Sequence, residues 1–93
     1  MRYVPGNLLV GFRAGVNFLR VKKIIGSLSN SGVRLYEDKE SPIDLLTKIT
    51  AYRVIIPEGE EDLWIERLRS LFDEIIHVDK WWIYPKGYNL KGS

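Results

Sequence analysis

Four short segments of the chain have the alternation or the composition of β-strands. They are residues 7–13, 33–37, 51–56 and 76–84. The Pro5-Gly6 pair before the first segment is typical of a turn, because proline fixes φ and glycine admits positive φ. We therefore expect four strands, the first of which begins after this turn.

Two further segments repeat apolar residues at helical spacing. The first begins after Asn17, a suitable N-cap, and stops in the polar run 29–32. The second begins with the acidic residues 60–62, which complement the positive end of a helix dipole, and runs to about Glu74. The expected buried stripes are Phe18, Val21, Ile24, Ile25 and Leu28 in the first helix, and Trp64, Leu68, Leu71, Phe72 and Ile75 in the second.

The resulting element order is β-α-β-β-α-β, which predicts an α+β fold of the ferredoxin-like type. Right-handed crossovers place the four antiparallel strands in the order 4-1-3-2, with both helices on one face of the sheet. The charged segment 38–44 contains Ser41-Pro42 and is expected to be a loop. In the first strand, Leu8, Val10 and Phe12 are expected to face the helices, and Leu9, Gly11 and Arg13 the opposite, open side.

A chain of 93 residues builds a single core, so we expect one domain over 1–85 and a flexible tail over 86–93. Cysteine is absent, which excludes disulfides and thiolate metal sites. The single histidine, His77, has no obvious second ligand or base, and no serine or glycine stands in a nucleophile-elbow or phosphate-loop motif. The sequence therefore predicts no catalytic residues, no metal and no cofactor, and a protein that is not an enzyme.

The positive and negative side chains, 14 and 12 in number, are interspersed, and the net charge is +2. No basic cluster indicates a nucleic-acid partner. Trp81-Trp82 and Tyr84 stand close to Lys80 and Lys86, and aromatic rings among lysines can stack on single-stranded bases. Binding of single-stranded nucleic acid is therefore kept as a lesser alternative.

No apolar run is long enough for a membrane span or a signal peptide, so we expect no membrane partner. The localisation stays open. It would be extracellular if the chain were a fragment of a secreted precursor.

Three stretches, in this order, resemble the propeptides of subtilisin-type serine proteases and the stand-alone inhibitors related to them. They are VPGNLLVGFRAGV at 4–16, AYRVIIPEG at 51–59 and IHVD at 76–79. The resemblance covers about residues 4–85 and implies the same β-α-β-β-α-β fold. Such domains place the open sheet face against two surface helices of the protease and thread the following tail through its active-site cleft. They act as folding chaperones, as temporary inhibitors or as separate inhibitors.

The resemblance also implies residue roles. Asp79 stands where the family usually has a glutamate that caps the N-termini of the two protease helices, where amide groups and helix dipoles attract an anion. The tail would bring Gly87 or Tyr88 near the primary specificity pocket. The protease-binding residues so predicted are Leu9, Gly11, Asp79, Tyr84, Pro85, Lys86, Gly87 and Tyr88.

An alternative of another class also fits the open sheet face. A generic ferredoxin-like module could use it to self-associate or to pair with another domain, without a protease partner.

Overall fold

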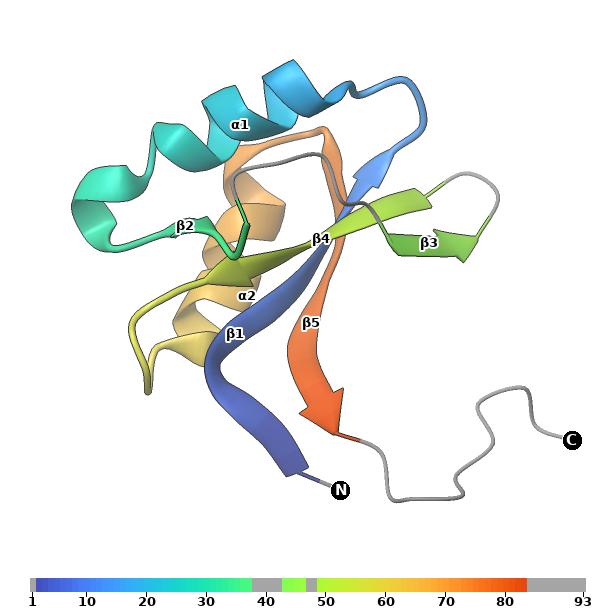
Figure 1. Ribbon diagram of the computed structural model, residues 1–93. Helices are drawn as coiled ribbons and strands as arrows, with labels where there is room; N and C mark the ends of the chain where they lie inside the picture. The colour runs from blue at the N-terminus through green and yellow to red at the C-terminus, as the bar shows by residue number, and fades with distance from the viewer. Residues whose placement is uncertain (1, 38–42, 47–48, 84–93) are drawn as a thin grey trace, which may run out of the picture.

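The computed structural model describes residues 2–37, 43–46 and 49–83, with the backbone alone for 43–46 (Figure 1). The two longer helices cover one face of a single antiparallel sheet. The elements are β1 (Arg2–Arg13), α1 (Phe18–Gly26), η1 (Ser29–Ser31, a 3-10 turn), β2 (Arg34–Leu35), β3 (Ile43–Leu46), β4 (Ile49–Ile55), α2 (Glu61–Leu71) and β5 (Ile75–Ile83).

The strands are arranged in the order β5-β1-β4-β2, and every pairing is antiparallel. With the strands numbered as the sequence predicted them, this order is 4-1-3-2. The predicted α+β class and the ferredoxin-like arrangement are therefore confirmed. The central strand β1 pairs with both β4 and β5, so it lies between the two halves of the fold.

The edge of the sheet next to β4 differs from the prediction, because two short strands share it. β2 pairs with the end of β4 at Val54 and Ile55, while β3 pairs with its beginning, Ile43 opposite Ala51. The loop predicted for 38–44 is thus wrong at Ile43 and Asp44, and residues 38–42 lie outside the described ranges. β2 pairs only with the last residues of β4. The first residues of β4 pair instead with β3, the segment that precedes β4 in the chain.

The turn predicted at Pro5-Gly6 is a bulge inside β1, which already begins at Arg2. The pairing register with β5 shifts between Tyr3 and Leu8. Proline has no amide hydrogen for a ladder and Gly6 has a φ of +73°, so this pair suits a bulge as well as a turn. The Gly6 amide donates to Glu61 Oε2 at 2.7 Å, which ties the bulge to the start of α2.

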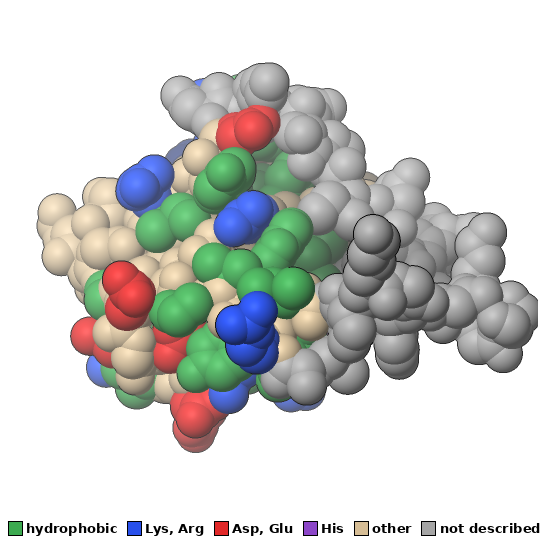
Figure 2. Space-filling view, turned by 60° about the horizontal axis from the view of Figure 1, so that its bottom comes forward, with side chains coloured by type: hydrophobic (Ala, Val, Ile, Leu, Met, Phe, Trp, Pro, Cys, Tyr) green, Lys and Arg blue, Asp and Glu red, His purple; other side chains and the backbone are tan. Residues whose placement is uncertain are grey.

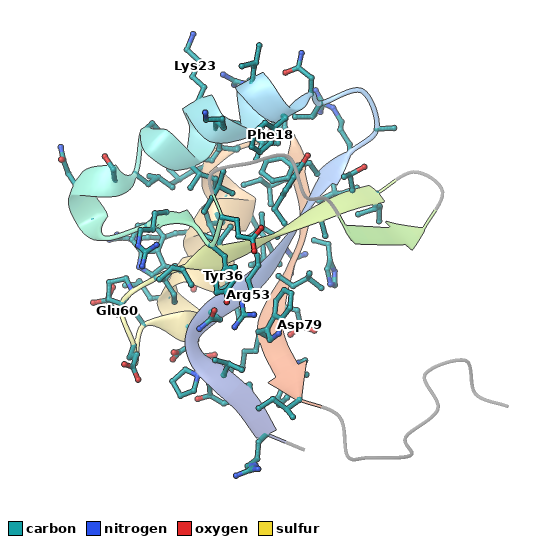
Figure 3. All side chains as sticks on the ribbon, viewed as in Figure 1. Phe18, Lys23, Tyr36, Arg53, Glu60 and Asp79 are labelled. Atoms are coloured by element: carbon teal, nitrogen blue, oxygen red, sulfur yellow. The ribbon has the colours of Figure 1, made fainter. Side chains whose placement is uncertain are left out.

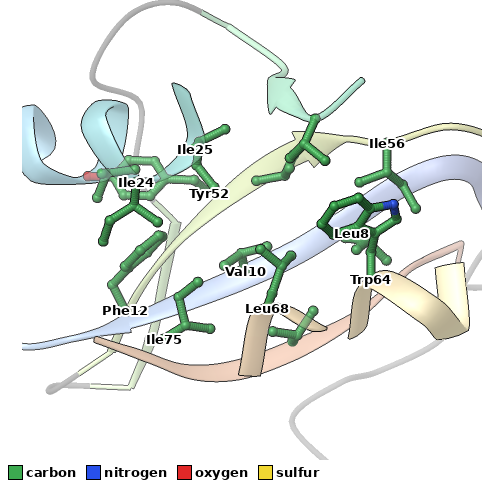
Figure 4. Packing of buried hydrophobic residues seen from close by; sticks show 14 residues of the cluster. Leu8, Val10, Phe12, Ile24, Ile25, Tyr52, Ile56, Trp64, Leu68 and Ile75 are labelled. Carbon is green, nitrogen blue, oxygen red and sulfur yellow. The ribbon is translucent and has the colours of Figure 1, made fainter. Parts of the chain in front are cut away.

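The core lies between the helices and the sheet (Figure 4). Leu8, Val10 and Phe12 are at most 1% exposed, which confirms the predicted inward face of β1. α1 and α2 complete the core from the helix side of the sheet with three of the five residues of the first predicted stripe and two of the five of the second. The fully buried side chains of these helices are Val21, Ile24 and Ile25 from α1, and Trp64 and Leu68 from α2.

Asn17 caps α1 as predicted, because its Oδ1 accepts a hydrogen bond from the Arg20 amide at 2.9 Å. The helix ends at Gly26, earlier than the polar run 29–32, where the 3-10 turn η1 follows. Within the described part of the chain, no helix is both long and apolar enough to cross a membrane.

The end of α2 also differs from the prediction. The helix stops at Leu71, and Phe72 is extended with φ −133° and ψ 121°. Leu71 is 56% exposed, so its place in the buried stripe was wrong, whereas Ile75 is buried as the first residue of β5. The chain must leave the helix early because Ile75 has to enter the sheet beside β1.

Candidate functional site

The face of the sheet opposite the helices is the candidate site, and we call it the free face. The pairing register places every second residue of each strand on this side. By this register its described residues are Asn7, Leu9, Gly11 and Arg13 from β1, Ile49, Ala51, Arg53 and Ile55 from β4, His77, Asp79 and Trp81 from β5, Arg34 from β2, and Tyr36, which follows β2.

The free face is mixed in character. Gly11 and Ala51 are buried at its centre, and Leu9, Arg53, Asp79 and Trp81 are half-buried around them. Seen from the lower side of the molecule, hydrophobic side chains gather with lysine and arginine side chains among them, and acidic ones lie mostly toward the rim (Figure 2). Aromatic and arginine side chains next to apolar ones are the composition of protein-binding surfaces.

Gly11 lies under two neighbouring side chains. A Cβ atom at this position would approach Ile49 Cγ2 to 2.9 Å and His77 Cβ to 3.2 Å. Gly11 is therefore placed on the free face as predicted but is not itself accessible. Its function there is to let its two neighbours close over β1.

We expect Gly11→Ala to lower the free energy of unfolding by about 1–3 kcal/mol, because the added methyl group overpacks the site. The double variant with Ile49→Ala should lose less stability than the sum of the two single losses, since the clashing group is then removed. Urea unfolding of the wild type, the two single variants and the double variant measures these free energies. Strict additivity would contradict the packing described for Gly11.

Arg53 contacts two aromatic rings on the free face, those of Tyr36 and Trp81, and we call these three residues the aromatic column; Figure 3 shows Arg53 beside Tyr36. Its guanidinium carbon is 4.1 Å from the ring centre of Tyr36 and 4.5 Å from that of Trp81. Tyr36 directly follows β2, Arg53 belongs to β4 and Trp81 to β5, so the column spans the sheet. The Nε of Arg53 donates a hydrogen bond to Asn7 Oδ1 at 2.8 Å.

Asp79 lies on the free face, directly across β1 from Arg53. Leu9 separates the two, because it pairs with Arg53 on one side and with Asp79 on the other. Asp79 Oδ1 accepts hydrogen bonds from the Lys80 amide at 2.7 Å and from the Trp82 indole at 3.1 Å. Among the described residues, Oδ2 has no hydrogen-bond partner, so one oxygen of the carboxylate is left for a ligand.

Neither tryptophan of β5 belongs to the central core. Trp81 stacks on Arg53, whereas Trp82 makes an edge-to-face contact with Tyr3 at a ring-centre distance of 5.7 Å. Lys80 lies over the Tyr3 ring at 4.5 Å and pairs with Asp62 of α2 at 3.6 Å. The end of β5 is thereby fastened to β1 and α2.

His77 is half-buried beside Gly11, as expected for a histidine in a strand. No group of three metal-ligating side chains occurs in the described ranges. The predicted tail residues Tyr84, Pro85, Lys86, Gly87 and Tyr88 lie outside these ranges. The structure thus brings together Leu9, Gly11 and Asp79 of the predicted site residues.

Sequence analysis missed Arg53 and Tyr36. The register that places them on one face depends on how β4 pairs with β1 and β2. The alternation of Tyr52, Val54 and Ile56 toward the core could have indicated that Arg53 points the other way. No protein-family model and no curated protein matches the chain.

Proposed function

We propose that this domain is a protein-binding module that inhibits, or assists the folding of, a subtilisin-type serine protease. It docks the free face on the protease surface and leads residues 84–88 into the active-site cleft. The proposal rests on the position and the hydrogen bonds of Asp79. Its carboxylate lies on the helix-free side, held by two hydrogen bonds to one oxygen, with no described partner for the other.

The position of Asp79 suits binding to helix N-termini. Such termini expose unpaired amide groups and the positive end of the helix dipole, and a fixed carboxylate satisfies both. The Trp82 indole and the Lys80 amide orient the side chain before a partner arrives. This preorganisation lowers the entropy lost on binding.

β5 also supports the proposal. It carries Asp79 and ends at Ile83, four residues further along. Residues 84–88 follow directly, so a partner that contacts Asp79 lies within reach of them. One docking event could therefore engage both the free face and the tail.

Inhibition of a subtilisin-type protease by the purified domain tests the proposal. We expect Asp79→Ala to raise the inhibition constant about tenfold or more, because a hydrogen bond to a charged group contributes about 1.5–3 kcal/mol. A version that ends after Ile83 should also inhibit more weakly. Asp73→Ala is the matched control, since Asp73 is an exposed carboxylate that precedes β5 and takes no part in the pairing of the strands.

Full inhibition by both altered forms would reject the contacts proposed here. Absence of inhibition by the wild-type domain would reject the protease as partner. A stable dimer in solution that buries the free face would then favour self-association. Oligonucleotide binding that weakens steeply with salt would favour the nucleic-acid alternative.

A further inference from the structure

We propose that Arg53 is a carboxylate-binding residue, which receives an acidic side chain of the partner protein on the free face. This deepens the proposed function and rests on it, because it specifies a second chemical contact beside Asp79. The inference starts from the aromatic column of Tyr36, Arg53 and Trp81.

Both rings contact the guanidinium group. The distances of 4.1 and 4.5 Å from its central carbon to the ring centres are typical of cation–π contacts. Arginine has a planar fork of five N–H donors that matches a carboxylate with two parallel hydrogen bonds. A fork that two rings and a hydrogen bond already hold in place loses less freedom when it binds a carboxylate.

Only one donor of the fork is used within the described structure. Nε donates to Asn7 Oδ1, and Asn7 is itself held, because its Nδ2 donates to the Pro5 carbonyl at 2.9 Å. Asn7 is only 8% exposed. Among the described residues, no carboxylate forms an ion pair with Arg53, so the two Nη groups have no anionic partner there.

The charges around Arg53 favour a single carboxylate as its ligand over a polyanion. Arg53, Leu9 and Asp79 lie in one row across β4, β1 and β5. Adjacent strands are about 4.8 Å apart, so the backbones that carry the two charges are separated by about 10 Å. A nucleic-acid strand along this row would meet the negative charge of Asp79, whereas a protein surface can present an acidic side chain to Arg53 and amide groups to Asp79.

The first test uses the domain alone, with acetate as the carboxylate probe. We expect sodium acetate to produce a saturable NMR shift of the Arg53 Nε–H and the Trp81 indole N–H, which sodium chloride at equal ionic strength does not produce. Arg53→Lys should abolish the saturable shift of the indole, because lysine keeps the charge but has no planar fork. A shift that follows ionic strength alone would overturn the inference.

The second test uses the protease. Arg53→Lys should raise the inhibition constant about tenfold or more, in line with the loss of a charge-assisted bidentate pair. Arg69→Lys is the matched control, because Arg69 is an exposed arginine of α2, on the helix side of the sheet, for which no aromatic contact is found among the described residues. Folding of both variants is checked by thermal unfolding.

The outcomes separate the inference from the proposed function. If the wild-type domain inhibits and Arg53→Lys inhibits equally well, the column is only structural and the inference fails while the proposed function stands. If the wild-type domain does not inhibit, the proposed function fails. Arg53 as a carboxylate site is then judged by the acetate titration.

Discussion

Replacing Trp64 with alanine should lower the free energy of unfolding by about 3–5 kcal/mol, the usual cost of removing a large aromatic side chain from a core. Trp64 is 2% exposed and faces the inner side of the sheet from α2 (Figure 4). The substitution leaves a cavity next to Leu8 and Leu68, which are both fully buried. Urea or thermal unfolding measures the loss.

The indole nitrogen of Trp64 contributes a smaller part of this stability than the apolar ring does. Its indole Nε1 donates to Glu60 Oε1 at 2.9 Å. Trp64→Phe keeps most of the apolar volume and loses this donor, so we expect a loss of about 1–2 kcal/mol. Leu63→Ala is the control on the same helix, because Leu63 is 44% exposed. A Trp64→Ala protein as stable as the Leu63→Ala protein would show that the core is packed differently.

Glu61→Ala should have the second largest effect, a loss of about 2–3 kcal/mol at neutral pH. Glu61 is 5% exposed, and its Oε2 accepts hydrogen bonds from the amides of Gly6 at 2.7 Å and of Gly59 at 3.2 Å. Removing the carboxylate leaves the buried Gly6 amide, in the bulge of β1, without its partner. Chemical unfolding at pH 7 measures the loss.

The contribution of Glu61 depends on pH. The hydrogen bond from the Gly6 amide lowers the pKa of Glu61 below its ordinary value of 4.5, although burial acts in the opposite direction. A carboxyl group whose pKa is lower in the folded than in the unfolded state contributes stability that is fully present above the unfolded pKa. This contribution is lost as the pH falls from about 4.5 through the lower folded value.

Glu61→Gln tests this dependence, because it keeps the shape of the side chain and cannot titrate. Its stability deficit relative to the wild type should be largest at neutral pH and should shrink as the pH falls below 4.5. Glu66→Gln is the control, since Glu66 is an exposed carboxylate of the same helix. A deficit for Glu61→Gln that stays constant down to acid unfolding would contradict the lowered pKa.

Glu61 also links stability to the free face. It holds the bulge at Gly6, and the next residue, Asn7, orients Arg53 through the bond to its Nε. Loss of the Glu61 carboxylate should therefore loosen the aromatic column as well as the fold. Arg53 can be followed in the Glu61→Gln protein through the acetate titration described above.

The sequence by itself determined the features that depend on local periodicity. Leu8, Val10 and Phe12 alternate with residues of the other face, and the apolar stripe of α1 repeats at helical spacing, so the inward side of both elements could be predicted. The Asn17 cap could be predicted too, because capping involves residues only three positions apart. From these elements the α+β class and the strand order followed.

The tertiary structure alone decided the features that join distant parts of the chain. Pro5-Gly6 became a bulge because Glu61, 55 residues away, accepts the Gly6 amide. Leu71 became exposed because the chain must leave α2 to bring Ile75 beside β1. Tyr36, Arg53 and Trp81 form one column only once their strands are paired. Periodicity along the chain carries no information on such contacts, since their energy comes from partners that only folding brings together.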